Sequence, residues 1–227
     1  MENPSILALI PAHNESASIS TIVAAVLPYL PVLVVDDGST DQTAALAESA
    51  GARVLRQTPN QGKGAALRAG FRLALQENVD AVLTLDADGQ HDPSEIPLFL
   101  SAYREQQDDL VIGFRNFRQM PFSRRLANTL GEILFSWAMR RPILDNQSGY
   151  RLIRRPVMQS CLDSREEGFE FEVEMIANCL HQDLKLAWVP IRTIYGEEKS
   201  HIQPLKHVFH FIRLVLKIRS ITKNHSR

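Results

Sequence analysis

The chain has 227 residues, of which 44% are hydrophobic, and this is enough apolar material for a sizeable buried core. Its 25 Lys and Arg residues nearly balance its 26 Asp and Glu residues, so the net charge gives no reason to expect nucleic-acid binding. Two cysteines without metal-like spacing, no secretory signal and no apolar run of roughly 18 residues indicate a cytoplasmic protein, soluble or peripheral to a membrane, without a zinc site.

The first half of the chain alternates short apolar runs with amphipathic segments. We expect strands at 6–10, 32–35, 53–56, 81–85 and 110–113, where apolar residues stand together and a polar cluster follows. Helical periodicity or helix-capping residues indicate helices at 14–27, 42–50, 65–77 and 92–106. This alternation predicts βαβ units with right-handed crossovers, and hence an α/β fold whose mostly parallel sheet is covered on both faces.

The pattern changes after residue 113. Residues 122–140 show helical periodicity, with a broad apolar face made of Leu126, Leu130, Ile133, Leu134 and Trp137. A polar turn at 145–151 runs into a short strand, 170–182 is another amphipathic helix, and 186–194 alternates like a strand in which Pro190 marks an edge or a bend. No internal repeat or low-complexity linker separates these elements, which favours one domain.

The last expected element, 204–221, is a basic amphipathic helix. Apolar residues recur at helical spacing opposite a face rich in Lys, Arg and His. Such a helix can lie in a membrane interface, dock on the sheet or form a dimer contact, and the pattern leaves all three open. We expect 1–203 to form the main domain and 204–227 to form this helix and a tail.

The polar clusters after the strands should meet at one edge of the sheet, because ligands of such sheets bind outside the carboxyl ends of the strands. The most acidic cluster runs from Asp86 to Asp92. Within it Asp86, Asp88 and Gln90 offer oxygen ligands at alternate positions, and oxygen-only ligands favour Mg²⁺ or Mn²⁺ over zinc. We predict that these three residues bind a metal ion that bridges the protein to phosphates; the alternative is a solvated turn.

Lys63 lies between two glycines in a turn that opens a helix. The first backbone N–H groups of a helix have no partner within the helix, and the helix dipole is positive at that end. The position therefore favours either a phosphate group or an acidic partner.

Four motifs in this order resemble the successive signatures of the inverting family 2 glycosyltransferases, which have the GT-A fold. They are LIPAHNE at 9–15, VVDDGSTD at 34–41, NQGKGAALRAG at 60–70 and DADGQH at 86–91. Two further motifs, GFR at 113–115 and SGYR at 148–151, are similar to motifs of the dolichyl-phosphate mannose synthase and polyprenyl-phosphate glycosyltransferase group. The resemblance covers residues 5–201. Gly89 and Gln147 depart from the pattern of the mannose synthases.

The resemblance implies a role for each motif on the donor side. Pro11, Ala12, Asn14 and Glu15 would line the nucleotide pocket, Asp36 would contact the base or ribose, Gly38 would allow a close turn, and the segment around Lys63 would close over the nucleotide. Asp86 would hold the ribose or the ion, and Asp88 with Gln90 would hold the ion on the diphosphate. Lys199-Ser200-His201 resembles a segment whose basic residues reach the same diphosphate.

On the acceptor side we assign Arg115 and Arg151, with Arg124 or Arg125 as further candidates, because arginine presents a fork of donors that matches phosphate. A phosphate monoester is already ionised near neutrality and needs little proton removal. A hydroxyl acceptor needs a carboxylate base, for which Asp145, Glu170 and Glu172 are the candidates.

The sequence thus predicts an inverting, metal-dependent glycosyltransferase that moves a sugar from a nucleoside-diphosphate sugar to a polyprenyl phosphate or another lipid-linked acceptor at the cytoplasmic membrane face. The alternatives are a hydroxyl acceptor on a glycan or glycolipid, or a non-catalytic membrane-bound adaptor, against which the intact acidic and basic motifs count. A sugar nucleotidyltransferase would need a Gly-rich basic loop after the first strand, and a Rossmann oxidoreductase would need Gly-x-Gly-x-x-Gly; the sequence has neither there.

Overall fold

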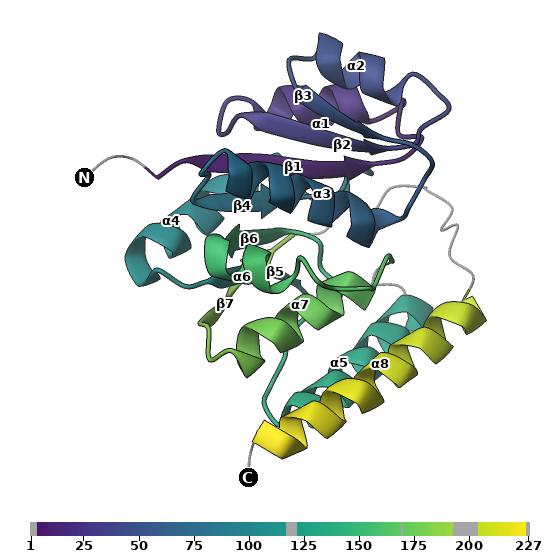
Figure 1. The fold of residues 1–227 in the computed structure, drawn as a ribbon, viewed down its shortest axis with the longest axis vertical. Helices are drawn as coiled ribbons and strands as arrows, with labels where there is room; N and C mark the ends of the chain where they lie inside the picture. The colour runs from purple at the N-terminus through teal and green to yellow at the C-terminus, as the bar shows by residue number, and fades with distance from the viewer. Residues whose placement is uncertain (1–3, 117–121, 169, 193–203, 226–227) are drawn as a thin grey trace.

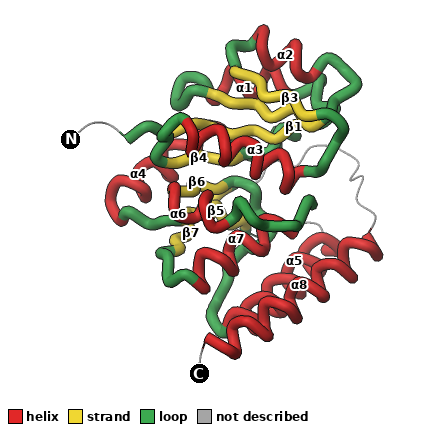
Figure 2. The backbone as a smooth tube through the Cα atoms, in the orientation of Figure 1, coloured by secondary structure: helices red, strands yellow, loops and turns green. Residues whose placement is uncertain are grey.

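The computed structural model describes residues 4–116, 122–168, 170–192 and 204–225. Within them a seven-stranded sheet has the order β3-β2-β1-β4-β6-β5-β7 (Figure 1, Figure 2). The strands are β1 (Ile6–Ala12), β2 (Val32–Asp37), β3 (Arg53–Gln57), β4 (Ala81–Thr84), β5 (Leu110–Arg115), β6 (Arg151–Arg154) and β7 (Leu186–Ile191). Neighbouring strands are parallel except at β6, which runs antiparallel to β4 and β5.

Helices cover both faces of the sheet. They are α1 (Ile19–Val26), α2 (Thr43–Ser49), α3 (Lys63–Gln76), the 3₁₀ turn η1 (Pro93–Glu95), α4 (Ile96–Gln106), α5 (Phe122–Met139), α6 (Arg155–Ser160), α7 (Glu170–His181) and α8 (Pro204–His225). Apolar side chains of α1, α2 and α4 form the core on one face, while those of α3, α5, α6, α7 and α8 form the core on the other. The predicted α/β fold with a mostly parallel sheet is confirmed.

The central strands are buried on both faces, as parallel strands between two helical layers must be. Along β1, Leu7 and Leu9 point into the core under α3, whereas Ala8 and Ile10 point into the core under α1. This explains why the strands read as unbroken apolar runs rather than as alternating patterns. Pro190 lies in β7, which is an edge strand of the sheet, as its missing N–H requires.

Several boundaries differ from those expected. Strand β5 continues to Arg115, so that this side chain stands at the end of the strand, and α3 begins at Lys63 rather than at 65. Helix α1 begins only at Ile19, because the backbone of 14–16 hydrogen-bonds to side chains of the loop after β2 and of the first residue of α2. The short helix α6 was not predicted, since six residues are too few for periodicity to show.

Helix α8 docks on the protein through its second half. Leu214, Val215 and Ile218 are buried against α5 and α7, and His181 Nε2 lies 2.9 Å from the hydroxyl of Thr222. The buried side of this helix therefore docks on two other helices, α5 and α7. None of the helices in the described ranges is long and apolar enough to cross a bilayer.

Candidate active site

The loops after β1 and β2 are fastened to each other at the carboxyl edge of the sheet. Ala12 and Asp36 are register partners at the ends of the two strands. Asn14, which has a positive φ of 57°, accepts a hydrogen bond from Thr40 N at 2.8 Å and donates its own N–H to Ser39 Oγ at 2.9 Å. These contacts hold the two loops as one rigid wall of the expected nucleotide pocket.

The residues expected in this pocket differ in how much they expose. Asn14 is exposed and Pro11 and Glu15 are partly exposed, whereas Ala12 and Asp36 are buried. The Asp36 carboxylate accepts a 3.3 Å hydrogen bond from Ser39 N, which turns the loop after β2. The side chain of Asn14 connects the loop after β1 to the loop after β2 through its hydrogen bond with Thr40 N.

Gly38 and Asp37 bring the loop before α3 against β2. A Cβ on Gly38, whose φ is +71°, would lie 2.7 Å from Asn60 N, so only glycine permits this approach. The Asp37 carboxylate accepts hydrogen bonds from Gln61 N at 2.9 Å and Gly62 N at 2.7 Å. Asp37 is not among the predicted site residues, although its place beside Asp36 at a strand end is a usable signal.

The start of α3 is bound by acidic and carbonyl groups of the protein itself. Gly64 N donates to the carbonyl of Glu167 at 2.7 Å, so this helix-start donor is already used. The Lys63 ammonium lies 2.5 Å from Asp86 Oδ1 and 3.1 Å from Glu172 Oε1, with only 17% of its side chain exposed. Of the two partners that the sequence left open for Lys63, the structure contains the acidic one.

This ion pair sets the charge of the acidic turn. Burial raises the pKa of the Asp86 carboxyl, but the Lys63 ammonium outweighs it and lowers that pKa to about 2. Burial lowers the pKa of Lys63, yet Asp86 and Glu172 together raise it above its usual value. Asp86 is therefore ionised and already compensated by a lysine.

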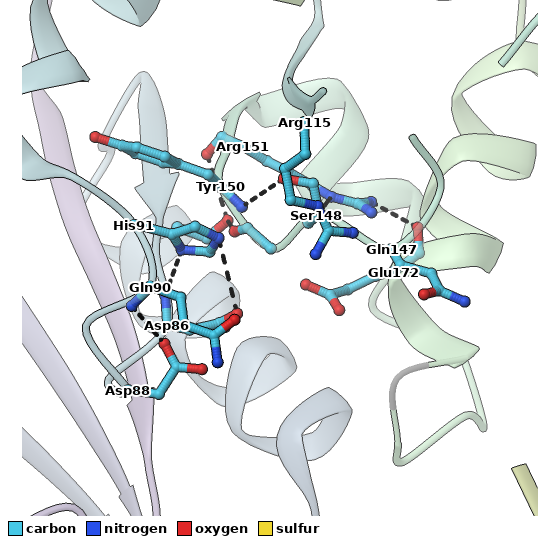
Figure 3. A network of polar contacts seen from close by, with 12 residues as sticks. Asp86, Asp88, Gln90, His91, Arg115, Gln147, Ser148, Tyr150, Arg151 and Glu172 are labelled. Atoms are coloured by element: carbon cyan, nitrogen blue, oxygen red, sulfur yellow. Dashed lines mark hydrogen bonds and ion pairs between the residues drawn. The ribbon is translucent and has the colours of Figure 1, made fainter. Parts of the chain in front are cut away.

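The rest of the turn is shaped by Asp88 and His91 (Figure 3). Asp88 Oδ1 accepts a hydrogen bond from Gln90 N at 2.9 Å, around Gly89 with its φ of +76°. Burial lowers the pKa of His91 to about 4, so its ring is neutral near pH 7, and Nδ1 accepts a 3.1 Å hydrogen bond from Asp86 N. His91 is thus a hydrogen-bonding partner within the loop.

The donor set of this turn fits a hard divalent cation. Asp88 and Gln90 are partly exposed oxygen donors on one tight turn, beside the Asp86 carboxylate. The described residues contain no cluster of three or more His, Cys, Asp or Glu side chains that could hold a metal by themselves. A cation bound here would therefore complete its coordination with substrate or water oxygens, as Mg²⁺ usually does.

Arg115 is held by Asp145 beside an open hollow. Its Nε and Nη2 lie 2.7 Å and 2.9 Å from the two Asp145 oxygens, a fork-to-carboxylate pair. The hollow has a volume of about 580 Å³ and is lined by the end of β5, by α5 and by β7; among its lining residues are Arg115, Arg125, Thr129, Glu132 and Leu144. Arg115 thus lies in the wall of this hollow.

Arg151 does not lie at an acceptor surface, contrary to our expectation. Its side chain is fully buried and donates to the carbonyls of Ser148 at 2.6 Å, Glu172 at 2.6 Å and Asn146 at 3.3 Å (Figure 3). Arg151 is the first residue of β6. Its side chain faces α7 and connects the 146–148 loop to that helix through hydrogen bonds. It is a structural residue of the site rather than a ligand of the acceptor.

Two of the three candidate general bases are likewise engaged, and the third, Glu170, is buried at the start of α7. Asp145 is fully buried and accepts hydrogen bonds from Arg115, Gln147 N and Ser148 N. Glu172 is buried and pairs with Lys63, while its Oε2 has no hydrogen-bond partner among the described residues. Both oxygens of Asp145 are thus occupied by donors, and the side chain is placed to orient Arg115.

Two expected contributors lie outside what the structure describes. Lys199-Ser200-His201 falls in the segment 193–203, and the side chain of Arg124 is not described. Arg125 is exposed and lines the hollow with Arg115.

A parallel sheet with one antiparallel strand, polar loops at its carboxyl edge and an acidic turn after β4 define a glycosyltransferase of the GT-A fold. The chain belongs to glycosyl transferase family 2, whose family model matches residues 8–162. Within that family it groups with the polyprenyl-phosphate sugar transferases. It is similar to the undecaprenyl-phosphate mannosyltransferase of Micrococcus luteus, at 32% identity over 85% of this chain and 84% of that protein.

Other relatives agree. The polyprenol monophosphomannose synthase of Mycolicibacterium smegmatis is 32% identical over 82% of this chain and 76% of its own. Among solved structures, glucosyl-3-phosphoglycerate synthase from Mycobacterium tuberculosis, in complex with Mn²⁺, UDP-glucose and phosphoglyceric acid, matches 96% of this chain and 80% of its own with a TM-score of 0.79. At 20% sequence identity that likeness shows the fold.

Proposed function

We propose that this enzyme transfers a sugar from a nucleoside-diphosphate sugar to the phosphate of a polyprenyl phosphate, with inversion at the anomeric carbon. The names of the relatives from Micrococcus luteus and Mycolicibacterium smegmatis support a lipid phosphate as acceptor. In an inverting transfer the acceptor oxygen attacks the anomeric carbon from the face opposite the departing diphosphate. The site must therefore hold the two phosphorylated groups on opposite sides of the sugar.

On the donor side we propose Mg²⁺ or Mn²⁺ held by Asp88 and Gln90, with Asp86 beside them. Such an ion would neutralise the charge that develops on the leaving diphosphate. Because Lys63 already compensates Asp86, the carboxylate of Asp88 supplies most of the negative charge for the ion. The walls formed by Pro11, Asn14 and Glu15 would hold the nucleotide, with Asp36 at its base or ribose.

The observation that carries the acceptor assignment is the pairing of Arg115 with Asp145 at the hollow. Asp145 fixes the plane of the guanidinium, which then approaches a ligand in the hollow with little loss of side-chain entropy. Because Asp145 and Glu172 are both engaged by cations, they suit an acceptor that is already ionised. A phosphate monoester meets this requirement, whereas a hydroxyl acceptor would need a further base, such as Glu170.

We further propose that residues 1–203 form the catalytic unit and that the helix at 204–221 contacts the cytoplasmic face of a membrane, where a polyprenyl phosphate resides. The outer side of α8 supports this, since Ile212 and Leu216 are exposed next to Arg213 and Lys217.

The decisive experiment offers a panel of nucleotide sugars, with Mg²⁺ or Mn²⁺, to the enzyme and a short-chain polyprenyl phosphate. We expect product with the phosphate and none with the corresponding polyprenol. Asp88→Asn should lower kcat by roughly a hundredfold or more at unchanged melting temperature, because it removes a charge that acts only as the leaving group departs. Full activity of Asp88→Asn with added metal would contradict the metal assignment, and transfer to the alcohol would contradict the acceptor.

Arg115→Lys tests the acceptor side separately. The variant keeps the charge but loses the planar fork, so the KM for the polyprenyl phosphate should rise roughly tenfold or more while the KM for the donor changes little. A rise in the KM for the donor alone would contradict the assignment of Arg115 to the acceptor side.

A further inference from the structure

Helix α5 is apolar on two sides. Phe135, Ala138 and Met139 are buried in the core. Four further side chains recur at the spacing of one helical stripe and are between 40% and 57% exposed: Leu130, Ile133, Leu134 and Trp137. A helix that only packs on its own core needs one apolar side, so the second one calls for a separate explanation.

The stripe is part of a larger apolar surface shared with α8. The two helices lie side by side at one end of the molecule (Figure 1, Figure 2). Six of the ten large hydrophobic side chains that are exposed in the described residues belong to this pair, namely the four of α5 with Ile212 and Leu216 of α8. Such clustering exceeds the scattered exposure of a monomer's surface.

The stripe borders the Arg115 hollow. At about 100° per residue, Arg125, Thr129 and Glu132 share one side of α5, and all three line the hollow. Going around the helix from this side, the stripe comes next. Gly131 follows beyond the stripe, and Phe211 of α8 lies beside Gly131. The exposed apolar surface therefore lies between α8 and the opening in which Arg115 stands.

Basic residues surround this surface. Arg125, Arg140 and Arg141 on and after α5, and Arg213 and Lys217 on α8, are all exposed. The Arg219 guanidinium lies 4.5 Å from the centre of the Trp137 ring and donates to the Trp137 carbonyl at 2.9 Å, which fixes an aromatic ring at the surface. A second copy of this chain would bring these like charges together, whereas anionic lipid headgroups would pair with them.

We propose that the outer face of α5, made of Leu130, Ile133, Leu134 and Trp137, is the principal membrane-contacting surface, with Ile212 and Leu216 extending it onto α8. The apolar side chains enter the headgroup region, the surrounding arginines and lysine stay at the phosphates, and the hollow opens beside the bilayer surface. This inference extends the proposed membrane contact of the helix at 204–221 to a helix far from it in sequence.

The test is co-sedimentation of the full chain with vesicles of phosphatidylglycerol and phosphatidylcholine. Ile133→Asn/Leu134→Asn should lower the vesicle partition coefficient roughly tenfold or more, since two partly inserted apolar side chains are lost. The matched control, Leu98→Asn, changes an equally exposed leucine of α4 and should bind as the wild type does. Pure phosphatidylcholine vesicles should bind the wild type more weakly.

Equal vesicle binding of the double variant and the wild type would overturn the proposal, as would a wild-type dimer in sedimentation that the double variant dissociates. Transfer to a water-soluble short-chain polyprenyl phosphate should be unchanged in the double variant, because neither residue lines the hollow. If no nucleotide sugar supports transfer but the vesicle result holds, the proposed reaction fails and the surface stands. If transfer succeeds without vesicle binding, the surface fails and the reaction stands.

Discussion

Lys63 is the residue on which the charge balance of the site depends. It lies between Asp86 at the end of β4 and Glu172 at the start of α7, and so joins three elements through one ammonium group. The Glu172 side chain is only 3% exposed, so water cannot replace the lysine there. Two carboxylates and one lysine leave one net negative charge before any cation or substrate binds.

Replacing Lys63 with Met should therefore destabilise the fold by roughly 3 kcal/mol near pH 7, the usual cost of leaving a buried charge without its partner. Without the ammonium, burial raises the pKa of the Asp86 carboxyl above its unfolded value. The destabilising effect of that buried carboxylate is then greatest above this pKa and fades as the pH falls and the carboxyl protonates. Urea unfolding at pH 7.5 and pH 4.5 would measure this.

The control is Lys185→Met, at an exposed lysine, which should change the unfolding free energy by less than about 0.5 kcal/mol. A Lys63→Met variant whose deficit grew toward acid pH would show that the lysine does not compensate these carboxylates.

Sequence could identify the residues of the site more easily than their orientations. Asp88, Gln90 and Arg115 lie at the carboxyl edge as predicted, because strand ends and turns fix where a residue stands. Arg151 carries the same fork of donors as Arg115, but its side chain is buried and faces α7. Its donors bind backbone carbonyls there, and not a phosphate group. The type of a side chain indicates which chemistry it can perform. Its burial decides whether a ligand can reach it, and the sequence shows burial only through periodicity.

The antiparallel strand β6 brings the 145–151 turn against the acidic turn after β4. Thr84 donates its hydroxyl to the carbonyl of Gly149 at 2.8 Å, which fixes the two turns together. A Cβ on Gly149 would lie 2.8 Å from both oxygens of Asp86 and 3.0 Å from Glu172 Oε1. The absence of a side chain at 149 thus lets the two carboxylates and Lys63 meet.

Gly149→Ala should lower the unfolding free energy by about 1–3 kcal/mol and lower kcat as well, because Asp86 has to move. Gly131→Ala is the matched comparison within α5. There the nearest atom would lie 3.6 Å from the new methyl group, and alanine is the better helix former, so stability should rise by about 0.5–1 kcal/mol. Thermal unfolding and steady-state kinetics of the two variants decide the matter; equal effects would rule out the steric argument.

The elements themselves were predictable where strong periodicity or an abrupt strand end marks them. The apolar face of α5 shows the limit of such patterns. The apolar residues that predicted this face, such as Ile133 and Trp137, are exposed, whereas Phe135 and Ala138 are buried in the core. Periodicity locates an apolar face, but only the packed neighbours determine which of two faces is covered.

Helix α8 connects two parts of the molecule, because its buried side chains belong to the same core as those of β5 and α7. Its inner side buries Leu214, Val215 and Ile218, and its outer side exposes Ile212 and Leu216. One helix thus contributes to the folding core and to the surface that we propose for lipid. Removing residues 204–227 would disturb both, so truncation cannot test membrane contact by itself.

Single substitutions in α8 separate the two roles. Ile218→Ala should cost about 2–4 kcal/mol of unfolding free energy, because its side chain is 2% exposed and a cavity would remain between α5, α7 and α8. Leu216→Ala, two residues earlier and 57% exposed, should change that free energy by less than about 0.5 kcal/mol and weaken vesicle binding instead. Urea titrations and vesicle sedimentation of both variants provide the measurement. Equal stability losses would mean that the outer side of α8 is also buried in solution, and the lipid surface would then have to be confined to α5.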